Sequence, residues 1–309
     1  MYDGACLSEP GSLQRAVGEL RVVAKRFGPE TVLDELRQVG CLKARFPRRI
    51  VPGWMDVVML NTGGGVAGGD RLDLAFGVSA GGQVTIAAQA AERFYRARAT
   101  DAPSYVRTRL TVEAGACLEW LPQETILFDR SALDRRLEVD LAADARFLGV
   151  ETVVFGRTAM GERVRQGWLR DLIRVRRGGE LLLHDAIRLD GNIDAAMSRP
   201  AIGAGAKVVT TIVYVAPDTS EKLAALRSSW PAAPSTSSRA SAPLSPSWPG
   251  VSRPSAHEPP CPPETGASAW NGMLVARLIG SDSSQVRQAV IAALAVLRAF
   301  RPLPRVWLC

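Results

Sequence analysis

Hydrophobic and polar residues alternate along most of the chain between residues 18 and 215. Leu20, Val22 and Ala24 alternate with largely charged neighbours, and a Gly28-Pro29 turn separates this run from the next one. A period of two is typical of β-strands that bury one face. Runs rich in β-branched residues predict further strands at Thr31–Val39, Val57–Leu60, Val84–Ala88, Tyr105–Val112, Phe147–Phe155 and Val208–Val215.

A short pattern occurs four times within this region. Each copy has an apolar position, a tight turn of small or polar residues, and an alternating strand. The copies begin at Val78, Val112, Leu141 and Val175, which are 34, 29 and 34 residues apart. Glycines in the turns suit β-hairpins because glycine tolerates positive φ. The repeat therefore predicts a mainly β fold of stacked β-hairpins with a solenoid-like or superhelical arrangement.

The hydrophobic period changes toward the C-terminus. Val286, Val290 and Leu294 lie on one face of a helix that we predict over Asp282–Phe300. A shorter helix is predicted from Asp218 to Arg227. The chain should therefore carry two helices after its last long run of strands.

Residues 231–266 differ from the rest of the chain in composition, since they hold 10 of the 20 prolines and eight serines. Such a segment buries too little apolar surface to offset its chain entropy, so we expect a disordered insertion. The remaining parts are then a flexible N-terminus at 1–17, a β-superhelical domain at 18–230, and a strand and helix at 267–309 that complete this domain.

Composition and charge describe an ordinary globular protein, with 47% hydrophobic residues, 22% charged residues and a net charge of +7. No apolar run is long enough to span a membrane, and no signal region precedes the strands. Five scattered cysteines without CxxC spacing fit reduced thiols, so we expect a cytoplasmic protein. The arginines accompany no nucleic-acid-binding motif, and we expect no nucleic-acid partner.

Two short motifs match known sites by residue type but not by context. Gly63–Gly68 fits G-x-G-x-x-G, but a strand-like run follows where a dinucleotide site needs a helix. Gly77–Gly81 fits the nucleophile motif G-x-S-x-G, but it lies in one of the repeated turns. The only histidines are His184 and His257, which leaves little material for histidine-based metal or Ser–His chemistry.

Several acidic residues lie in or beside strongly apolar strands. One interpretation is salt bridges to arginines such as Arg130, Arg157 and Arg163. Another is an interior lined with oxygen ligands, through which a divalent ion passes without being held. A third is a β-solenoid carbohydrate-active enzyme with a carboxylate pair, although aromatic residues are only 6% of the chain. These acids are Glu119, Glu124, Glu151 and Glu162.

Four blocks of sequence resemble the urease accessory protein family UreD, also called UreH. The blocks are GGVAGGDRL at 64–72, AERFYR at 91–96, LEWLPQETI at 118–126 and FGRTAMGE at 155–162. The C-terminal part, 273–307, resembles that of the same family, so the resemblance covers 18–307 apart from the insertion. Signature residues in these blocks are Gly68, Gly69, Arg71, Tyr95, Arg96, Gln123 and Arg157.

The resemblance implies a non-catalytic scaffold with a two-layer β-superhelix and two helices. It implies partners: apo-urease (UreABC), on which the scaffold docks, and the accessory proteins UreF and UreG, which it recruits. It permits a dimer of the heteromeric complexes. It also implies that Ni(II) passes through in transit and that no cofactor is bound tightly. Candidate residues for the nickel path or an interface are then Asp70, Glu124, Glu151 and Glu162.

Overall fold

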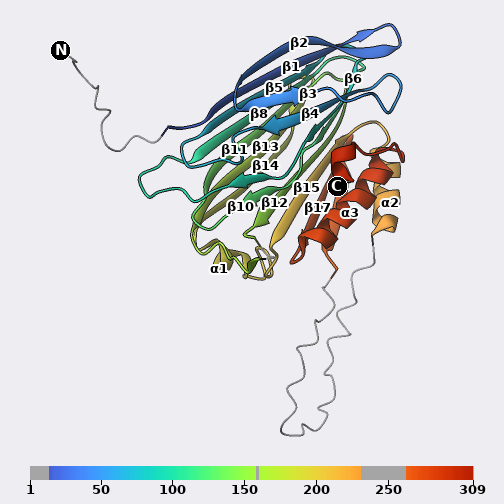
Figure 1. Cartoon of the computed structure of the whole chain (residues 1–309). Helices are drawn as coiled ribbons and strands as arrows, with labels where there is room; N and C mark the ends of the chain where they lie inside the picture. Colours follow the sequence, from blue (N-terminus) through green and yellow to red (C-terminus); the bar gives the residue numbers. More distant parts are fainter. Residues whose placement is uncertain (1–13, 158–159, 231–261, 309) are drawn as a thin grey trace, which may run out of the picture.

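Two stacked, open β-sheets form the body of the protein, and two helices lie against one of them (Figure 1). The structure is a computed structural model that describes residues 14–157, 160–230 and 262–308. The mainly β fold expected from the alternation is confirmed. Within the described part of the chain, no helix is long and apolar enough to cross a membrane.

The seven-stranded sheet has one face in the core and one face in solvent. Its outer positions are mostly charged, which explains the clear alternation in the sequence. In spatial order its strands are β14 (Glu180–Gly191), β13 (Gly167–Arg177), β11 (Ala132–Leu141), β8 (Ser104–Val112), β5 (Arg71–Val78), β1 (Val17–Phe27) and β2 (Glu30–Gly40).

The ten-stranded sheet packs on the inner face of the first sheet. Its main order is β16 (Glu264–Trp270), β17 (Met273–Gly280), β15 (Val208–Val215), β12 (Arg146–Phe155), β9 (Cys117–Leu121), β6 (Gln83–Ala88), β4 (Met55–Asn61) and β3 (Leu42–Arg45). The short strands β10 (Thr125–Leu127) and β7 (Glu92–Phe94) pair beside β12. All six strands predicted from β-branched runs are present.

The repeated turns do not make hairpins in three of their four copies, so the hairpin prediction is wrong there. The chain leaves β5, β8 and β11 of the seven-stranded sheet and enters β6, β9 and β12 of the other sheet. Equivalent strands then pair in parallel within each sheet. Neighbouring turns are linked as well, since Gly81 N donates to Ala114 O over 2.9 Å. Of the four copies, only the one between β13 and β14 forms an antiparallel hairpin, through Gly178 and Gly179 at positive φ.

Both predicted C-terminal helices are confirmed, as α2 (Thr219–Ser229) and α3 (Ser283–Leu297). Asp282 caps α3 by accepting from the backbone N–H of Gln285. The helices cover the outer face of the ten-stranded sheet around β15 and β17, which is why those strands are apolar on both faces. The sequence did not predict the short helices α1 (Ile193–Met197) and η3 (Arg305–Trp307).

Two segments expected to be unstructured are partly ordered. Residues 1–13 and 231–261 lie outside the described residues, so most of both predictions is untested. Arg15 pairs with Asp101, however, and β1 begins at Val17, inside the expected flexible N-terminus. Similarly, β16 begins at Glu264, within the last residues of the expected insertion.

Candidate functional site

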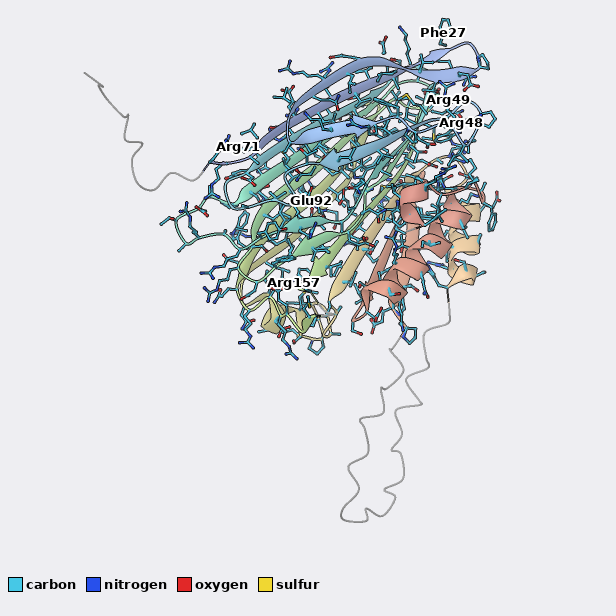
Figure 2. The ribbon with its side chains drawn as sticks, viewed as in Figure 1. Phe27, Arg48, Arg49, Arg71, Glu92 and Arg157 are labelled. Carbon is cyan, nitrogen blue, oxygen red and sulfur yellow. The ribbon has the colours of Figure 1, made fainter. Side chains whose placement is uncertain are left out.

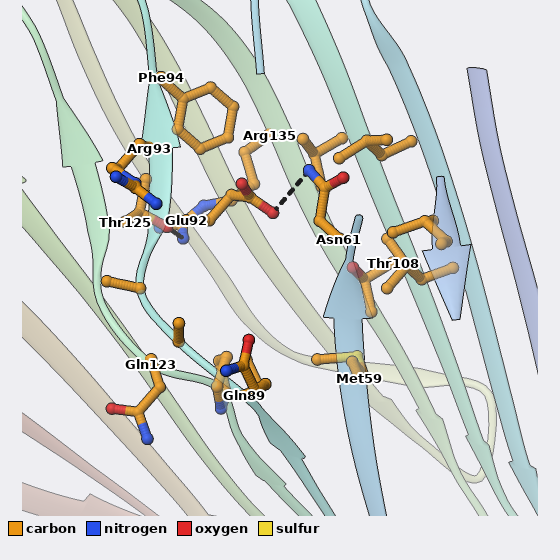
Figure 3. A pocket seen from close by; sticks show the side chains of 18 of the residues that line it. Met59, Asn61, Gln89, Glu92, Arg93, Phe94, Thr108, Gln123, Thr125 and Arg135 are labelled. Atoms are coloured by element: carbon orange, nitrogen blue, oxygen red, sulfur yellow. Dashed lines mark hydrogen bonds between the residues drawn. The ribbon is translucent and has the colours of Figure 1, made fainter. Parts of the chain in front are cut away.

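A cavity of about 170 Å³ lies between the two sheets, and we call it the inter-sheet cavity (Figure 3). It forms because alternate residues of both sheets point into the space that separates them. The wall mixes apolar side chains with polar and charged ones. Lining residues include Leu42, Met59, Leu72, Leu74, Val106, Phe94, Trp120 and Leu137.

One wall of the inter-sheet cavity carries a buried charge network centred on Arg135. Nε of Arg135 donates to Oδ1 of Asp171 over 2.9 Å, and Nη1 lies 2.6 Å from Oε2 of Glu151. Nη1 also donates to the Thr125 hydroxyl, and Trp120 Nε1 donates to Glu151 Oε1 over 2.7 Å. Each charge in this network has partners, which is the condition under which ions persist in an apolar interior.

Burial raises the pKa of the Glu151 carboxyl above its ordinary value, although Arg135 opposes this shift. Glu151 lies on the inner face of β12 because residues 147, 151, 153 and 155 of that strand all point into the core. Of the four candidate carboxylates predicted from the sequence, Glu151 is the one that lines the inter-sheet cavity.

Glu92 lines the same cavity and was not singled out by the sequence reasoning. Its Oε2 accepts from Asn61 Nδ2 over 3.1 Å, and Figure 3 shows the two side chains turned toward each other. Burial raises the pKa of Glu92 above its ordinary value. The available signal was its place in the AERFYR block, where it is the only acid. The cavity therefore brings together two carboxylates, from β7 and β12, and three arginines, Arg93, Arg135 and Arg136.

Asp70 has a different environment, although it too is buried. Its Oδ1 accepts from the backbone N–H of Ala16 and its Oδ2 from that of Ala67, both over 2.8 Å. The carboxylate thus closes the glycine-rich loop and fastens the start of β1 to β5. A Cβ on Gly68 of this loop would meet Ala97 Cβ at 2.7 Å, which explains a glycine there.

Glu124 and Gln123 hold the C-terminal segment against the ten-stranded sheet. Nη1 of Arg287 on α3 donates to Oε1 of both residues, over 2.7 Å each. The Arg287 guanidinium lies over the Trp307 ring, 4.8 Å from its centroid, and Gln123 Nε2 donates to Val306 O. We call these contacts the C-terminal latch.

Glu162 is apart from the other three carboxylates and pairs with Arg157. Nε of Arg157 donates to Oε2 of Glu162 over 2.8 Å. This hydrogen bond lowers the pKa of Glu162 below its ordinary value. Arg157 also lies over the Phe128 ring, and the Tyr95 and Phe128 rings pack in a T-shaped arrangement. The Tyr95 hydroxyl donates to Gly64 O, so this cluster supports the glycine-rich loop.

The remaining signature residues lie on the surface or shape the same loop. Arg71 sits at the start of β5 beside β1, with its guanidinium 5.5 Å from the Tyr105 ring centroid (Figure 2). Arg96 is exposed, and Gly69 has a φ of +84°.

The four candidate carboxylates are thus not gathered at one place. The salt-bridge interpretation holds for all four acids that the apolar strands suggested, because each pairs with an arginine. Only the Arg157 partner of Glu162 was among the expected arginines; the others come from β11, α3 and the segment after α3. Among the described residues, no group of three or more His, Cys, Asp or Glu is arranged to hold a metal ion.

Glu119 forms a second buried charge cluster, on the helix-facing side of the ten-stranded sheet. Its Oε2 accepts from Arg298 Nε over 3.0 Å and from the Thr85 hydroxyl over 2.8 Å, and its Oε1 pairs with Arg301. Glu119 and Arg298 are each almost completely buried. The cluster ties the end of α3 to β6 and β9.

Comparison with known proteins gives one consistent result. The sequence matches the profile of the family described as UreD urease accessory protein over residues 16–308. A urease accessory protein UreD from Xanthobacter autotrophicus is 41% identical over 296 residues, which cover 95% of this chain and 90% of that protein. The relative from Sinorhizobium medicae is 43% identical, with 95% and 96% covered. The one from Methylobacterium sp. is 40% identical, with 95% of each covered.

Proposed function

The chain belongs to the UreD family of urease accessory proteins, and on that premise we propose that it is a scaffold for nickel insertion into urease. In this proposal it docks on apo-urease, recruits UreF and UreG, and gives Ni(II) a path toward the urease metallocentre. Membership in a family of accessory proteins confirms the expectation that the chain is not an enzyme.

The inter-sheet cavity is the observation that carries the nickel part of the proposal. Glu92 and Glu151 present carboxylate oxygens to a cavity of mixed polar and apolar lining, and such oxygens bind divalent ions. Three arginines, Arg93, Arg135 and Arg136, also line the cavity, so the lining as a whole carries no net negative charge. Nickel is therefore cargo that these residues would bind weakly enough to release.

The other candidate carboxylates do not line the inter-sheet cavity, and each of them holds a part of the fold in place. Asp70 and Glu162 shape the region around the glycine-rich loop, and Glu124 holds the C-terminal latch. We propose that they position surfaces for partners. We also propose that the parallel winding of strands between the sheets is a two-layer β-superhelix, that the protein works in the cytoplasm, and that two heteromeric complexes associate as a dimer.

The experiment that tests the proposal is urease activation in nickel-supplied cells that carry the other urease genes. Urease specific activity and the nickel content of purified urease are measured with and without this chain. Both should depend on it. Activity that is equal in its absence, or a chain that is soluble but never restores activity, would contradict an accessory role.

A double variant and a matched control distinguish a role of the inter-sheet cavity in nickel transfer from a role in binding the partner proteins. Glu92→Gln with Glu151→Gln keeps the side-chain size but removes the negative charge, and at residue 151 it leaves one acceptor oxygen for the two donors Trp120 and Arg135. It should lower the nickel content of urease while UreF and apo-urease still co-purify with the chain. Glu180→Gln on the exposed start of β14 is the matched control. If urease matured with the double variant contains as much nickel as urease matured with the wild type, the proposal that nickel passes through the inter-sheet cavity is wrong.

A further inference from the structure

A second cavity, of about 260 Å³, lies at one end of the ten-stranded sheet. The first residues of β6, β9 and β12, which are Gln83, Cys117 and Arg146, line it together with the start of α2 and the end of α3. We call it the strand-start cavity. It lies on the helix-facing side of the sheet and does not share lining residues with the inter-sheet cavity.

The strand-start cavity has an excess of positive charge. Four cationic side chains line it, whereas only two carboxylates, Glu119 and Asp218, do so. Asp56 also interacts with two of the cations, but it lines a separate depression. The balance within the cavity is therefore two positive charges, in a place where burial strengthens electrostatic attraction. The four cations are Arg146, Lys222, Arg298 and Arg301.

One donor nitrogen of these cations has no hydrogen-bond partner. Among the described residues, Nη1 of Arg301 is one of two buried side-chain polar atoms without a hydrogen-bond partner. A buried donor of this kind is costly unless something accepts from it. The Arg301 guanidinium is also held in place, because it lies 3.7 Å from the centroid of the Trp54 ring and pairs with Glu119.

Arg146 and Lys222 are the more accessible cations of the cavity. The closest charged atoms of Arg146 and Asp218 are 3.7 Å apart, a loose ion pair, and half of the Arg146 side chain is exposed. The Asp218 carboxylate instead accepts from the Tyr214 hydroxyl over 2.7 Å. Asp218 therefore does not cap α2 with its side chain, and the positive end of that helix faces the same region. Lys222 donates one hydrogen bond, to Val296 O.

We propose that the strand-start cavity binds a phosphate group. A phosphate dianion balances the two excess charges, and its oxygens accept readily from guanidinium and ammonium donors. The same group is carried by inorganic phosphate and by nucleoside monophosphates, and the chemistry of the cavity is common to both. This site is independent of the proposed nickel passage.

The test is calorimetric titration of the purified full-length protein with inorganic phosphate at constant ionic strength, with chloride as the balancing salt. A parallel titration uses adenosine monophosphate. We expect saturable binding of one phosphate group per chain. Tighter binding of adenosine monophosphate would identify a nucleotide as the source, and equal or weaker binding would identify the free ion. Failure of both ligands to bind saturably would overturn the proposal.

A charge-removal variant locates the site. Arg146→Gln with Lys222→Gln removes both accessible cations, and it should raise the dissociation constant for phosphate at least tenfold. Arg107→Gln, on the exposed face of β8, removes one charge elsewhere and should leave it unchanged. Circular dichroism checks that each variant is folded. Binding by the folded double variant with wild-type affinity would overturn the assignment to this cavity.

Discussion

Arg287 and Glu124 are 163 positions apart in the sequence, yet Nη1 of Arg287 lies 2.7 Å from Oε1 of Glu124. The same nitrogen donates to Gln123, and the guanidinium covers Trp307. This one side chain therefore joins the LEWLPQETI block, α3 and the C-terminal segment. The block acts here as an anchor for the C-terminal part of the chain.

Glu124→Ala should destabilise the fold, because Arg287 loses a charged acceptor in a partly buried position. We expect a loss of about 1–3 kcal/mol in the free energy of unfolding, measured with urea. Glu180→Ala, on the exposed end of β14, is the control and should change little. If Glu124→Ala leaves stability intact but lowers urease activation, Glu124 acts on nickel or on a partner and not through the latch.

Arg135→Met should be among the most damaging single changes. It leaves Glu151 and Asp171 buried without their cation, and breaking such a pair typically costs about 3–5 kcal/mol. Chemical denaturation measures the loss. Arg107→Met, on the outer face of the same sheet, should be nearly neutral. Similar denaturation midpoints for Arg135→Met and Arg107→Met would show that the buried charge network contributes little to stability.

Glu92→Gln should stabilise the protein at neutral pH. Burial raises the pKa of Glu92 above 4.5, so the folded state binds its proton more readily than the unfolded state does. The ionised carboxylate therefore weakens folding above the raised pKa, and this cost disappears as the pH falls below 4.5. The difference in stability between variant and wild type should shrink on acidification. A difference that is constant between pH 7 and pH 4 would contradict this explanation.

Gly68→Ala should destabilise the glycine-rich loop, because the added Cβ would lie 2.7 Å from Ala97 Cβ and 3.0 Å from Asp101 Cβ. Overpacking of this kind typically costs about 1–3 kcal/mol. Gly77→Ala on β5 is the matched control, since its nearest neighbour would be 3.5 Å away in ordinary contact. Thermal unfolding of both variants checks the prediction, and equal midpoints would contradict it.

The candidate site was only partly predictable. The strand pattern correctly placed Glu151 in an apolar setting, but it placed Glu119 and Glu124 there as well. All three lie on the ten-stranded sheet or directly before one of its strands, and they face three different environments. Glu92 escaped notice because β7 has three residues, too few to show alternation. Burial depends on what packs opposite a strand, and that information is not local.

The pattern of residues was enough to predict the first strand, the six strands rich in β-branched residues, the two C-terminal helices and the family. A strand with one buried face must repeat its apolar residues every second position, and a packed helix must repeat them every three to four. The three-dimensional packing shows that Gly81 and its counterparts turn between sheets, and that Arg135 and Arg287 meet their carboxylates. Hairpin turns and inter-sheet turns need similar residues, so the residues of a turn do not tell the two types apart. Long-range ion pairs leave no periodic signal in the sequence. Both features therefore depend on how the whole chain packs.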